Sequence, residues 1–259
     1  MTWTTQPRSK LGDLTAITGG DGPLVVLIHG VGLRAEAWSG QIQALIGDFS
    51  VIATDLPGHG ESETLSGQQS LEDYVTAIGD ALSEPSLVVG HSMGAMIALA
   101  LAVRFPDRVS GICAMNAIYR RDQKAAAAVQ ARAAMLDGQS VADPSSTLDR
   151  WFGTETSVER SACERWLREV DPAGYRAAYA AFAQADAPED EALRALRMPA
   201  LFMTGALEPN STPEMSQAMA ALVPQGRAEV VAGAAHMMPM THVEVVNRQL
   251  LAFAEEILA

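Results

Sequence analysis

Residues 87–96 read Leu87-Val88-Val89-Gly90-His91-Ser92-Met93-Gly94-Ala95-Met96, and this stretch decides the fold. The apolar run Leu87–Val89 predicts a buried strand, and the alanine-rich stretch Ala95–Arg104 predicts a buried helix. Between them stands Gly-x-Ser-x-Gly, which in a strand–turn–helix context is typical of a nucleophile elbow. Such a turn strains the backbone of its middle residue and lifts that side chain above the sheet, so Ser92 is the predicted nucleophile. The two glycines of the motif lack a Cβ where neighbouring chain crowds the turn.

Strand and helix patterns alternate on both sides of this stretch. Apolar runs typical of strands covered on both faces occur at Leu24–Ile28, Ser50–Thr54, Val109–Met115, Ala200–Thr204 and Ala228–Val231. Helical spacing of apolar residues occurs at Ala35–Ile46, Leu71–Leu82, Pro213–Leu222 and Val243–Leu258. Leu11–Ile17 alternates weakly and is predicted to be an edge strand. Alternating strands and helices make a parallel sheet with helices on both faces, so the predicted fold class is α/β.

The segment between Ala117 and Arg197 shows no strand pattern. Within it, Arg120–Asp137 and Asp171–Gln184 are predicted helices. In such sheets, loops at the carboxyl ends of the strands carry the functional site, so an insertion there would cover that site. The predicted domains are a core made of 1–116 and 198–259, and an inserted all-helical cap made of 117–197.

The composition indicates which classes of protein the chain can belong to. The chain has 259 residues, of which 48% are hydrophobic and 19% charged, which is typical of a globular protein. Its 18 Lys and Arg against 31 Asp and Glu give a formal net charge of −13, which argues against nucleic acid or an acidic membrane as partner. Its 2 cysteines match no disulfide framework or metal-ligand spacing. No signal peptide or membrane-spanning run is visible, so we expect a soluble cytoplasmic protein.

A serine hydroxyl is a weak nucleophile and needs a base. His236 follows the last predicted strand in a small-residue loop that lets its ring reach back over the sheet, so it is the predicted base. His242 is the second candidate, although its place at the start of the closing helix favours a solvated or capping role. The remaining histidines are His91, expected to face away from the serine hydroxyl, and His29 and His59 in early loops.

The base in turn needs an acid that fixes its tautomer and stabilises the imidazolium. The loop Gly205–Asn210, after a predicted strand, holds a single carboxylate, Glu208. Ser92, Glu208 and His236 then follow the chain order nucleophile, acid, base. We expect Glu208 to accept a hydrogen bond from His236 Nδ1–H, which leaves Nε2 to face the serine. The Met93 amide, at the start of a helix, is expected to donate to an oxyanion.

Together these motifs resemble the α/β-hydrolases, in particular their capped esterase and lactonase group. The resemblance covers nearly the whole chain and rests on His29–Gly32 after an early strand, Asp55–Ser62, the elbow, the Glu208 loop and the late His236. It implies the α/β-hydrolase fold, with a mostly parallel central sheet. It also implies that the Val31 amide completes the oxyanion hole with Met93.

The chain departs from the family pattern at the acid. The family usually has Asp where Glu208 stands, and Glu is one methylene longer. Asn116, which ends the strand before the cap, stands where some relatives keep their acid. As a neutral amide, Asn116 could only orient a histidine. Asp55 opens a loop that in the family is a structural turn at the edge of the pocket.

The serine nucleophile predicts acyl-transfer chemistry, because dehalogenases and epoxide hydrolases of this fold carry aspartate at the elbow. The expected function is hydrolysis of a small carboxylic ester or lactone through an acyl-enzyme, with no metal and no organic cofactor. Alternatives are a C–C bond hydrolase, a lyase or a perhydrolase on the same fold, and a non-catalytic small-molecule receptor.

Substrate-binding residues are open, and the expected partner is the small ester or lactone itself. The first candidates are Arg34, Met96 and Met237. Further arginines that could hold a carboxylate are Arg120, Arg121, Arg150, Arg165, Arg168 and Arg176, for which a solvated helix face is the simpler interpretation. Further methionines that could line an adaptable apolar pocket are Met93, Met238 and Met240.

Overall fold

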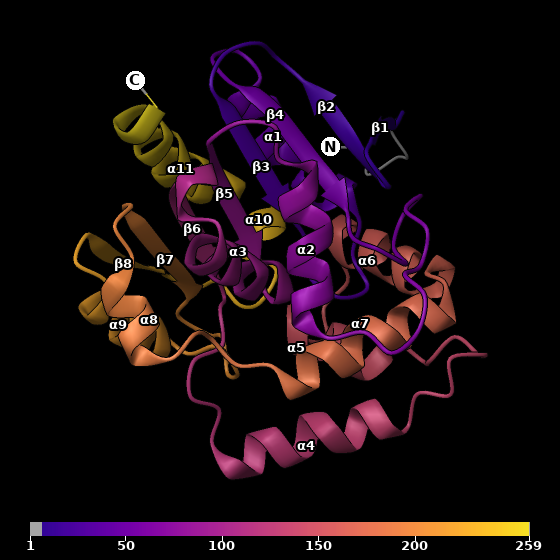
Figure 1. Cartoon of the computed structure of the whole chain (residues 1–259). Coiled ribbons are helices and arrows are strands. Elements are labelled where there is room, and N and C mark those ends of the chain that lie inside the picture. Colours follow the sequence, from indigo (N-terminus) through magenta and orange to yellow (C-terminus); the bar gives the residue numbers. More distant parts are fainter. Residues whose placement is uncertain (1–6, 259) are drawn as a thin grey trace.

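The computed structural model describes residues 7–258. In it the chain forms an eight-stranded sheet with the order β1-β2-β4-β3-β5-β6-β7-β8 (Figure 1). The strands are β1 Ser9–Leu11, β2 Leu14–Gly19, β3 Leu24–Ile28, β4 Ser50–Asp55, β5 Ser86–His91, β6 Val109–Met115, β7 Ala200–Gly205 and β8 Gly226–Val231. β1 and β2 pair antiparallel to their neighbours, and all pairings from β4 to β8 are parallel. The parallel strands therefore end at one common edge, where the loops of the predicted site follow them.

The sheet is buried on both faces, which explains its continuous apolar runs. In β3, Leu24, Val26 and Ile28 enter one hydrophobic core, whereas Val25 and Leu27 enter the other. Helices α2, α3 and α9 pack into the first core, and α1 and α11 into the second (Figure 1). The helical elements of this part are η1 Ala35–Trp38, α1 Ser39–Leu45, α2 Leu71–Ala81, α3 Met93–Arg104, η2 Pro106–Arg108, α9 Pro213–Leu222, α10 Met238–Thr241 and α11 Val243–Leu258. The prediction of an α/β fold with a mostly parallel sheet is confirmed.

The segment between β6 and β7 contains helices and no strand. These helices are α4 Gln123–Ala134, α5 Ser145–Phe152, α6 Val158–Glu169, α7 Pro172–Gln184 and α8 Asp190–Ala195. α7 lies against the core so closely that a Cβ on Gly174 would come 2.4 Å from the carbonyl oxygen of Gly58. α4 packs against α7 and buries none of its side chains (Figure 1). The division into a core and a cap at 117–197 stays a prediction.

Two expected elements differ in the structure. Leu11–Ile17 was expected to be a single edge strand, but the chain turns at Gly12, whose φ is +59°, and forms a hairpin of β1 and β2. β1 is therefore the edge, and β2 lies between β1 and β4. The helix expected at Ala35–Ile46 divides into the 3-10 helix η1 and the α-helix α1. In both cases a local change of backbone conformation interrupts a pattern that looks continuous in the sequence.

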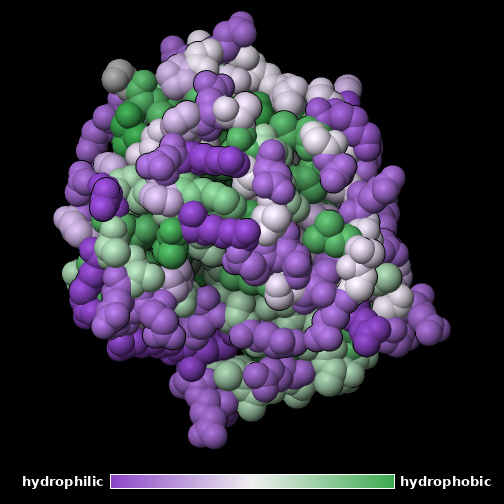
Figure 2. All heavy atoms as spheres, viewed as in Figure 1, coloured by the Kyte–Doolittle hydropathy of each residue, from purple (hydrophilic) through white to green (hydrophobic). Residues whose placement is uncertain are grey.

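The face of the molecule in Figure 2 is mostly polar. Hydrophilic residues predominate on the face shown in Figure 2, and hydrophobic residues form small separate groups there. Within residues 7–258, none of the helices has the length and hydropathy that crossing a membrane requires.

Candidate active site

Ser92 stands at the sharp turn between β5 and α3. Its backbone has φ 56° and ψ −118°, a positive φ that residues with a Cβ rarely adopt. The turn leaves no room beside it, because a Cβ on Gly90 would lie 2.1 Å from the Gly94 carbonyl oxygen. A Cβ on Gly94 would likewise lie 2.1 Å from the carbonyl oxygen of Ile28. The strained serine is thus held by close packing of backbone on backbone.

Two backbone amides near Ser92 have no acceptor among the described residues. Gly30 brings the loop after β3 close to the serine, since a Cβ there would lie 3.5 Å from Ser92 Oγ. The next amide along this loop, that of Val31, and the amide of Met93 at the first position of α3 donate to no described group. Helix geometry leaves the first amides of a helix without a partner. Both N–H groups are therefore available to an acceptor beside the serine.

Glu208 and His236 meet from neighbouring strand ends. Glu208 follows β7, His236 follows β8, and His236 Nδ1 lies 2.9 Å from Glu208 Oε2. The buried carboxylate also accepts the amides of Asn210 and Ser211 through Oε1, at 2.8 and 3.3 Å. Burial by itself raises the pKa of Glu208, but His236 and these amides outweigh it and lower that pKa to about 2. The ionised carboxylate can only accept, so it fixes the proton of a neutral His236 on Nδ1 and leaves Nε2 as an acceptor.

Ser92 and His236 line the same cavity, here called the serine cavity. It has a volume of about 410 Å³ and lies between the carboxyl edge of the sheet and helices α4, α5 and α7. Trp151 of α5 stacks on the His236 ring with the ring centroids 5.5 Å apart. No hydrogen bond joins Ser92 Oγ to His236 within the described residues, and catalytic bonds of this kind often tighten only when substrate binds.

The serine cavity is lined by three arginines, Arg121, Arg132 and Arg150. Arg121 is held by main-chain carbonyls. Arg132 donates to Ser146 Oγ at 3.1 Å, and Arg150 donates to Thr147 Oγ1 at 3.3 Å. Among the described residues, neither Arg132 nor Arg150 forms an ion pair with a carboxylate. Burial, and after it the charge of Arg132, lowers the pKa of Arg150. Two like charges without a counter-ion make this wall of the cavity attractive to an anion.

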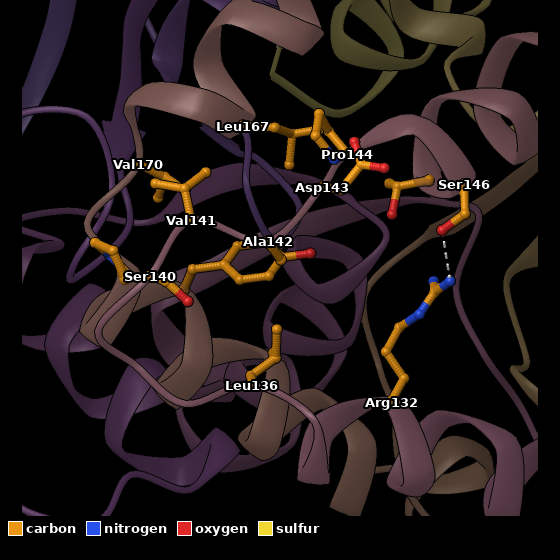
Figure 3. A pocket seen from close by; sticks show the side chains of 13 residues that line it. Arg132, Leu136, Ser140, Val141, Ala142, Asp143, Pro144, Ser146, Leu167 and Val170 are labelled. Carbon is orange, nitrogen blue, oxygen red and sulfur yellow. Dashed lines mark hydrogen bonds between the residues drawn. The ribbon is translucent and has the colours of Figure 1, made fainter.

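A smaller side cavity of about 70 Å³ adjoins the serine cavity and shares Arg132, Thr147 and Tyr175 with it. In Figure 3, Arg132 rises from α4 and points to Ser146, while Leu136 and Val141 contribute apolar groups to the same space. Arg132 thus stands at the boundary between the two cavities.

The structure brings some of the arginine candidates to the serine cavity and places the first candidates elsewhere. Arg121 and Arg150 line the cavity. Arg34 instead pairs with two glutamates, at 2.9 and 3.7 Å, and does not line it. Met96 and Met237 are buried and are likewise absent from the cavity wall. None of the three candidates therefore lines the serine cavity, because a position close to the loops or the elbow in sequence does not by itself turn a side chain into the cavity.

Arg132 and Trp151 were missed by the sequence reasoning. A usable signal existed for Arg132, which follows Ala128 by four residues and Val129 by three on α4 and faces the cavity with them. Trp151 of α5 stacks on His236, and its neighbour in sequence, Arg150, lines the same cavity. The spacing on α4 shows only which residues share one face of the helix, and the tertiary structure decides which face meets the serine cavity.

The other histidines are occupied elsewhere. His29 and His59 form a buried pair with ring centroids 5.4 Å apart, and they accept the amides of Leu56 and Gly32. Burial, and after it the charge of His59, lowers the pKa of His29 to about 3. His242 contacts Thr241 and does not line the serine cavity. His91 points its Nε2 at the carbonyl oxygen of His236, at 2.8 Å.

Comparisons with known proteins agree with this fold. A model of the alpha/beta hydrolase fold matches residues 23–243. The (E)-2-((N-methylformamido)methylene)succinate hydrolase of Acinetobacter baylyi is 39% identical over 243 residues, which cover 91% of this chain and 92% of that protein. A pimeloyl-acyl-carrier-protein methyl ester esterase of Xanthomonas oryzae pv. oryzae is 29% identical over 248 residues, 92% of this chain and 97% of its own.

A solved structure shows the same architecture. The thermophilic esterase of Thermogutta terrifontis, with malate bound, matches with a TM-score of 0.85 and 25% identity, covering 98% of this chain and 100% of that one. The family model extends over most of the sequence, and the A. baylyi relative is similar along nearly its full length. The chain therefore belongs to the alpha/beta hydrolase family.

Proposed function

We propose that this protein is a serine hydrolase that transfers the acyl group of a small carboxylic ester or lactone to water through an acyl-enzyme. The observation that carries the proposal is the serine cavity itself. It joins a strained serine at a strand–helix turn to a histidine whose Nδ1 lies 2.9 Å from a buried carboxylate. A nucleophile, a base and an acid with a fixed tautomer are the parts that acyl transfer requires.

In the proposed cycle, His236 Nε2 takes the proton of Ser92 as Oγ attacks the substrate carbonyl. The amides of Val31 and Met93 donate to the oxyanion, and one such donor contributes about 3 kcal/mol in known cases. The alcohol leaves with the proton that His236 holds. Water then attacks the acyl-enzyme, gives a proton to His236, and releases the carboxylic acid as Ser92 recovers its proton. Glu208 stays ionised throughout and stabilises the imidazolium.

The cap helices support an anionic substrate. Arg132 on α4 and Arg150 on α5 face the serine cavity without a carboxylate partner among the described residues, in a chain whose formal net charge is −13. A guanidinium binds a carboxylate through two parallel hydrogen bonds, so a pair of them suits a substrate with one or two carboxylates. The malate in the T. terrifontis esterase and the succinate in the name of the A. baylyi relative are both dicarboxylates. We therefore propose that residues 117–197 form a cap that selects acid-bearing substrates.

A second candidate for the scissile bond is the amide of an N-acylated enamine. It is favoured by the A. baylyi relative, which is 39% identical and is named for hydrolysis of an N-formylated methylenesuccinate. The same serine, base and oxyanion donors would serve, since His236 can protonate a nitrogen leaving group as it does an alcohol. Hydrolysis of a C–C bond in a diketone acid and ligand binding without turnover are alternatives that the substrate panel below separates. A lyase step and perhydrolysis are further alternatives on the same fold.

The nucleophile is tested with a fluorophosphonate, which labels activated serines. The wild-type protein should gain one phosphonyl group by intact mass, and Ser92→Ala should gain none and lose roughly 10⁴-fold or more in ester turnover. Ser86→Ala is the matched control, because Ser86 begins β5, the strand that leads to Ser92, and its buried hydroxyl has no hydrogen-bond partner among the described residues. Labelling of Ser92→Ala at the wild-type rate would overturn the proposal.

The substrate class is tested by comparing kcat/KM over a panel. The panel contains p-nitrophenyl acetate, monomethyl succinate, a lactone acid, an N-formylaminomethylene succinate and a vinylogous diketone acid. We expect the acid-bearing acyl compounds to exceed p-nitrophenyl acetate, and the favoured one identifies the scissile bond. Exclusive turnover of the diketone would instead assign C–C hydrolysis. Tight binding with no turnover and no labelling would assign a receptor.

A further inference from the structure

The carbonyl oxygen of His236 receives two hydrogen bonds from side chains at the ends of other strands. Asn116, directly after β6, donates through Nδ2 at 2.6 Å, and His91, the last residue of β5, donates through Nε2 at 2.8 Å. Both side chains belong to nearly inaccessible residues, with 1% and 2% of their surface exposed. A carbonyl oxygen has two lone pairs, so these donors saturate it.

The rest of the loop that carries His236 has few attachments. Between the end of β8 and the start of α10, the hydrogen bonds of the described backbone run from Ala234 N–H to Val231 and from Leu207 N–H to Ala234. Further along this loop, the first carbonyl oxygen that accepts a hydrogen bond is that of His236, from Asn116 and His91. After it, Met237 already accepts bonds from within α10. The hydrogen bonds that hold the main chain at His236 itself therefore come from Asn116 and His91.

Asn116 also has a backbone that suits a polar amide. Its φ is +53°, a left-handed conformation that Asn adopts more readily than other residues with a Cβ. Its Oδ1 lies 3.4 Å from the amide of Gly205, at the end of the strand that leads to Glu208. Gly205 in turn lies under the base loop, where a Cβ would come 2.3 Å from the carbonyl oxygen of Ala234. Asn116 thus connects the strand of the acid with the loop of the base.

The orientation of the Asn116 amide follows from these partners. If the amide were flipped, its oxygen would face the His236 carbonyl oxygen and its nitrogen would face the Gly205 N–H. Two acceptors and two donors would then oppose each other, so Nδ2 is the atom that faces His236. His91 must likewise carry its proton on Nε2 to donate to the carbonyl. Burial, and after it the charge of His236, lowers the pKa of His91 to about 3, so His91 is neutral where the enzyme would work.

We infer that Asn116 and His91 are positioning residues, which set the place of the His236 ring by holding its main-chain carbonyl. This inference rests on the proposed function, in which His236 is the base. Neither residue needs to touch the reacting atoms. His91 links the base to β5, which leads to Ser92. Asn116 links the base to Gly205 at the end of β7, which leads to Glu208. The three catalytic groups thereby keep one relative position. Misplacement of a catalytic group by about 1 Å can cost on the order of 10²-fold in rate.

The first test is Asn116→Gly, which keeps the left-handed backbone and removes only the side chain. We expect kcat for the best ester of the panel to fall roughly 10–100-fold, with KM within about threefold of wild type. The rate of fluorophosphonate labelling should fall by the same factor, because it depends on activation of Ser92 and not on substrate recognition. Unchanged kcat and labelling would overturn the inference. A change in KM alone would assign Asn116 to substrate contact and would overturn it as well.

The second test uses His91, so that a folding defect at one position does not decide the matter. His91→Leu should lower kcat and the labelling rate in the same way, and His91→Gln, which keeps an N–H donor of similar reach, should recover most of both. The double variant Asn116→Gly/His91→Leu should depart from the product of the single effects, because both side chains act on one carbonyl. Multiplicative effects, or a Gln variant as poor as Leu, would contradict a shared role.

Thr54→Val is the matched control, since the buried Thr54 hydroxyl of β4 donates to the Leu27 carbonyl oxygen with no link to the site. We expect it to lower the melting temperature and to leave kcat and labelling unchanged. An equal loss of kcat in this control would mean that general destabilisation explains the Asn116 result. Labelling of Ser92→Ala at the wild-type rate would overturn the proposed function. Wild-type kinetics in Asn116→Gly would overturn only the positioning role, so the two failures can be told apart.

Discussion

Glu208 carries its carboxylate one methylene further from the main chain than the aspartate usual in the family would. Both oxygens of the longer side chain have partners: Oε2 accepts from His236, and Oε1 accepts from the amides of Asn210 and Ser211. The backbone N–H of Glu208 also donates to the Gly205 carbonyl oxygen at 3.1 Å, which closes the turn beneath the side chain. The carboxylate is therefore fixed by its own loop, independently of the histidine.

At the residue scale we predict that Glu208→Gln lowers ester turnover roughly 10²–10⁴-fold. The amide keeps the shape but can present an N–H to Nδ1, which would favour the wrong tautomer of His236. Glu208→Asp should retain more activity than Glu208→Gln, because it keeps the charge. The measurement is steady-state kcat, with the exposed Glu229→Gln on β8 as control. Near-normal turnover by the Gln variant would show that the acid lies elsewhere.

At the scale of elements, α4 differs from the other helices of the 117–197 segment. It buries no side chain of its own, yet Ala125, Ala128, Val129 and Arg132 line the serine cavity. Its alanines allow a close approach with little apolar anchoring, and its contacts are mainly with α7. The helix therefore contributes a wall and a charge to the cavity, and little to the hydrophobic core.

We predict that Arg132→Leu raises KM for an acid-bearing ester about 10–100-fold and leaves p-nitrophenyl acetate little changed. The reason is the loss of a charge-assisted hydrogen bond to a carboxylate, worth about 1.5–3 kcal/mol. Lys124→Leu is the matched control, because Lys124 is an exposed cation on the same helix that does not line the cavity. Equal effects of both variants, or equal effects on neutral and anionic esters, would contradict a carboxylate contact at Arg132.

At the scale of the whole molecule, three buried histidines make stability depend on pH. Burial is the first cause that lowers the pKa of His29, His59 and His91, and for His29 and His91 the value falls to about 3. An unfolded histidine has a pKa of about 6.5, so below that pH the unfolded state binds more protons than the folded state. The free energy of unfolding must then decrease as the pH falls from about 6.5 towards 3. Glu208, with a lowered pKa of about 2, loses its contribution only below about pH 4.5.

We predict that the free energy of unfolding, measured by denaturant titration, is lower at about pH 5.5 than at about pH 7.5. The loss should be on the order of 1.4 kcal/mol for each of His29 and His91, whose pKa values lie near 3, and His59 should add to it in the same direction. His29→Gln keeps an acceptor for the Leu56 amide, and it should remove the contribution of one histidine to the change in unfolding free energy with pH. A stability that is flat across this range would show that these histidines do not titrate on unfolding.

The sequence by itself determined the fold class and the order of Ser92, Glu208 and His236, because each depends on a short signal. An apolar run, a Gly-x-Ser-x-Gly turn and a loop after a strand are local patterns, and a parallel sheet brings all strand ends to one edge. Only the tertiary structure decided which side chains surround them. Arg132 and Trp151 reach the serine cavity because of how α4 and α5 pack, and Asn116 and His91 meet the His236 carbonyl across three strand ends. Such contacts join residues far apart in the chain, so no local pattern of residues encodes them.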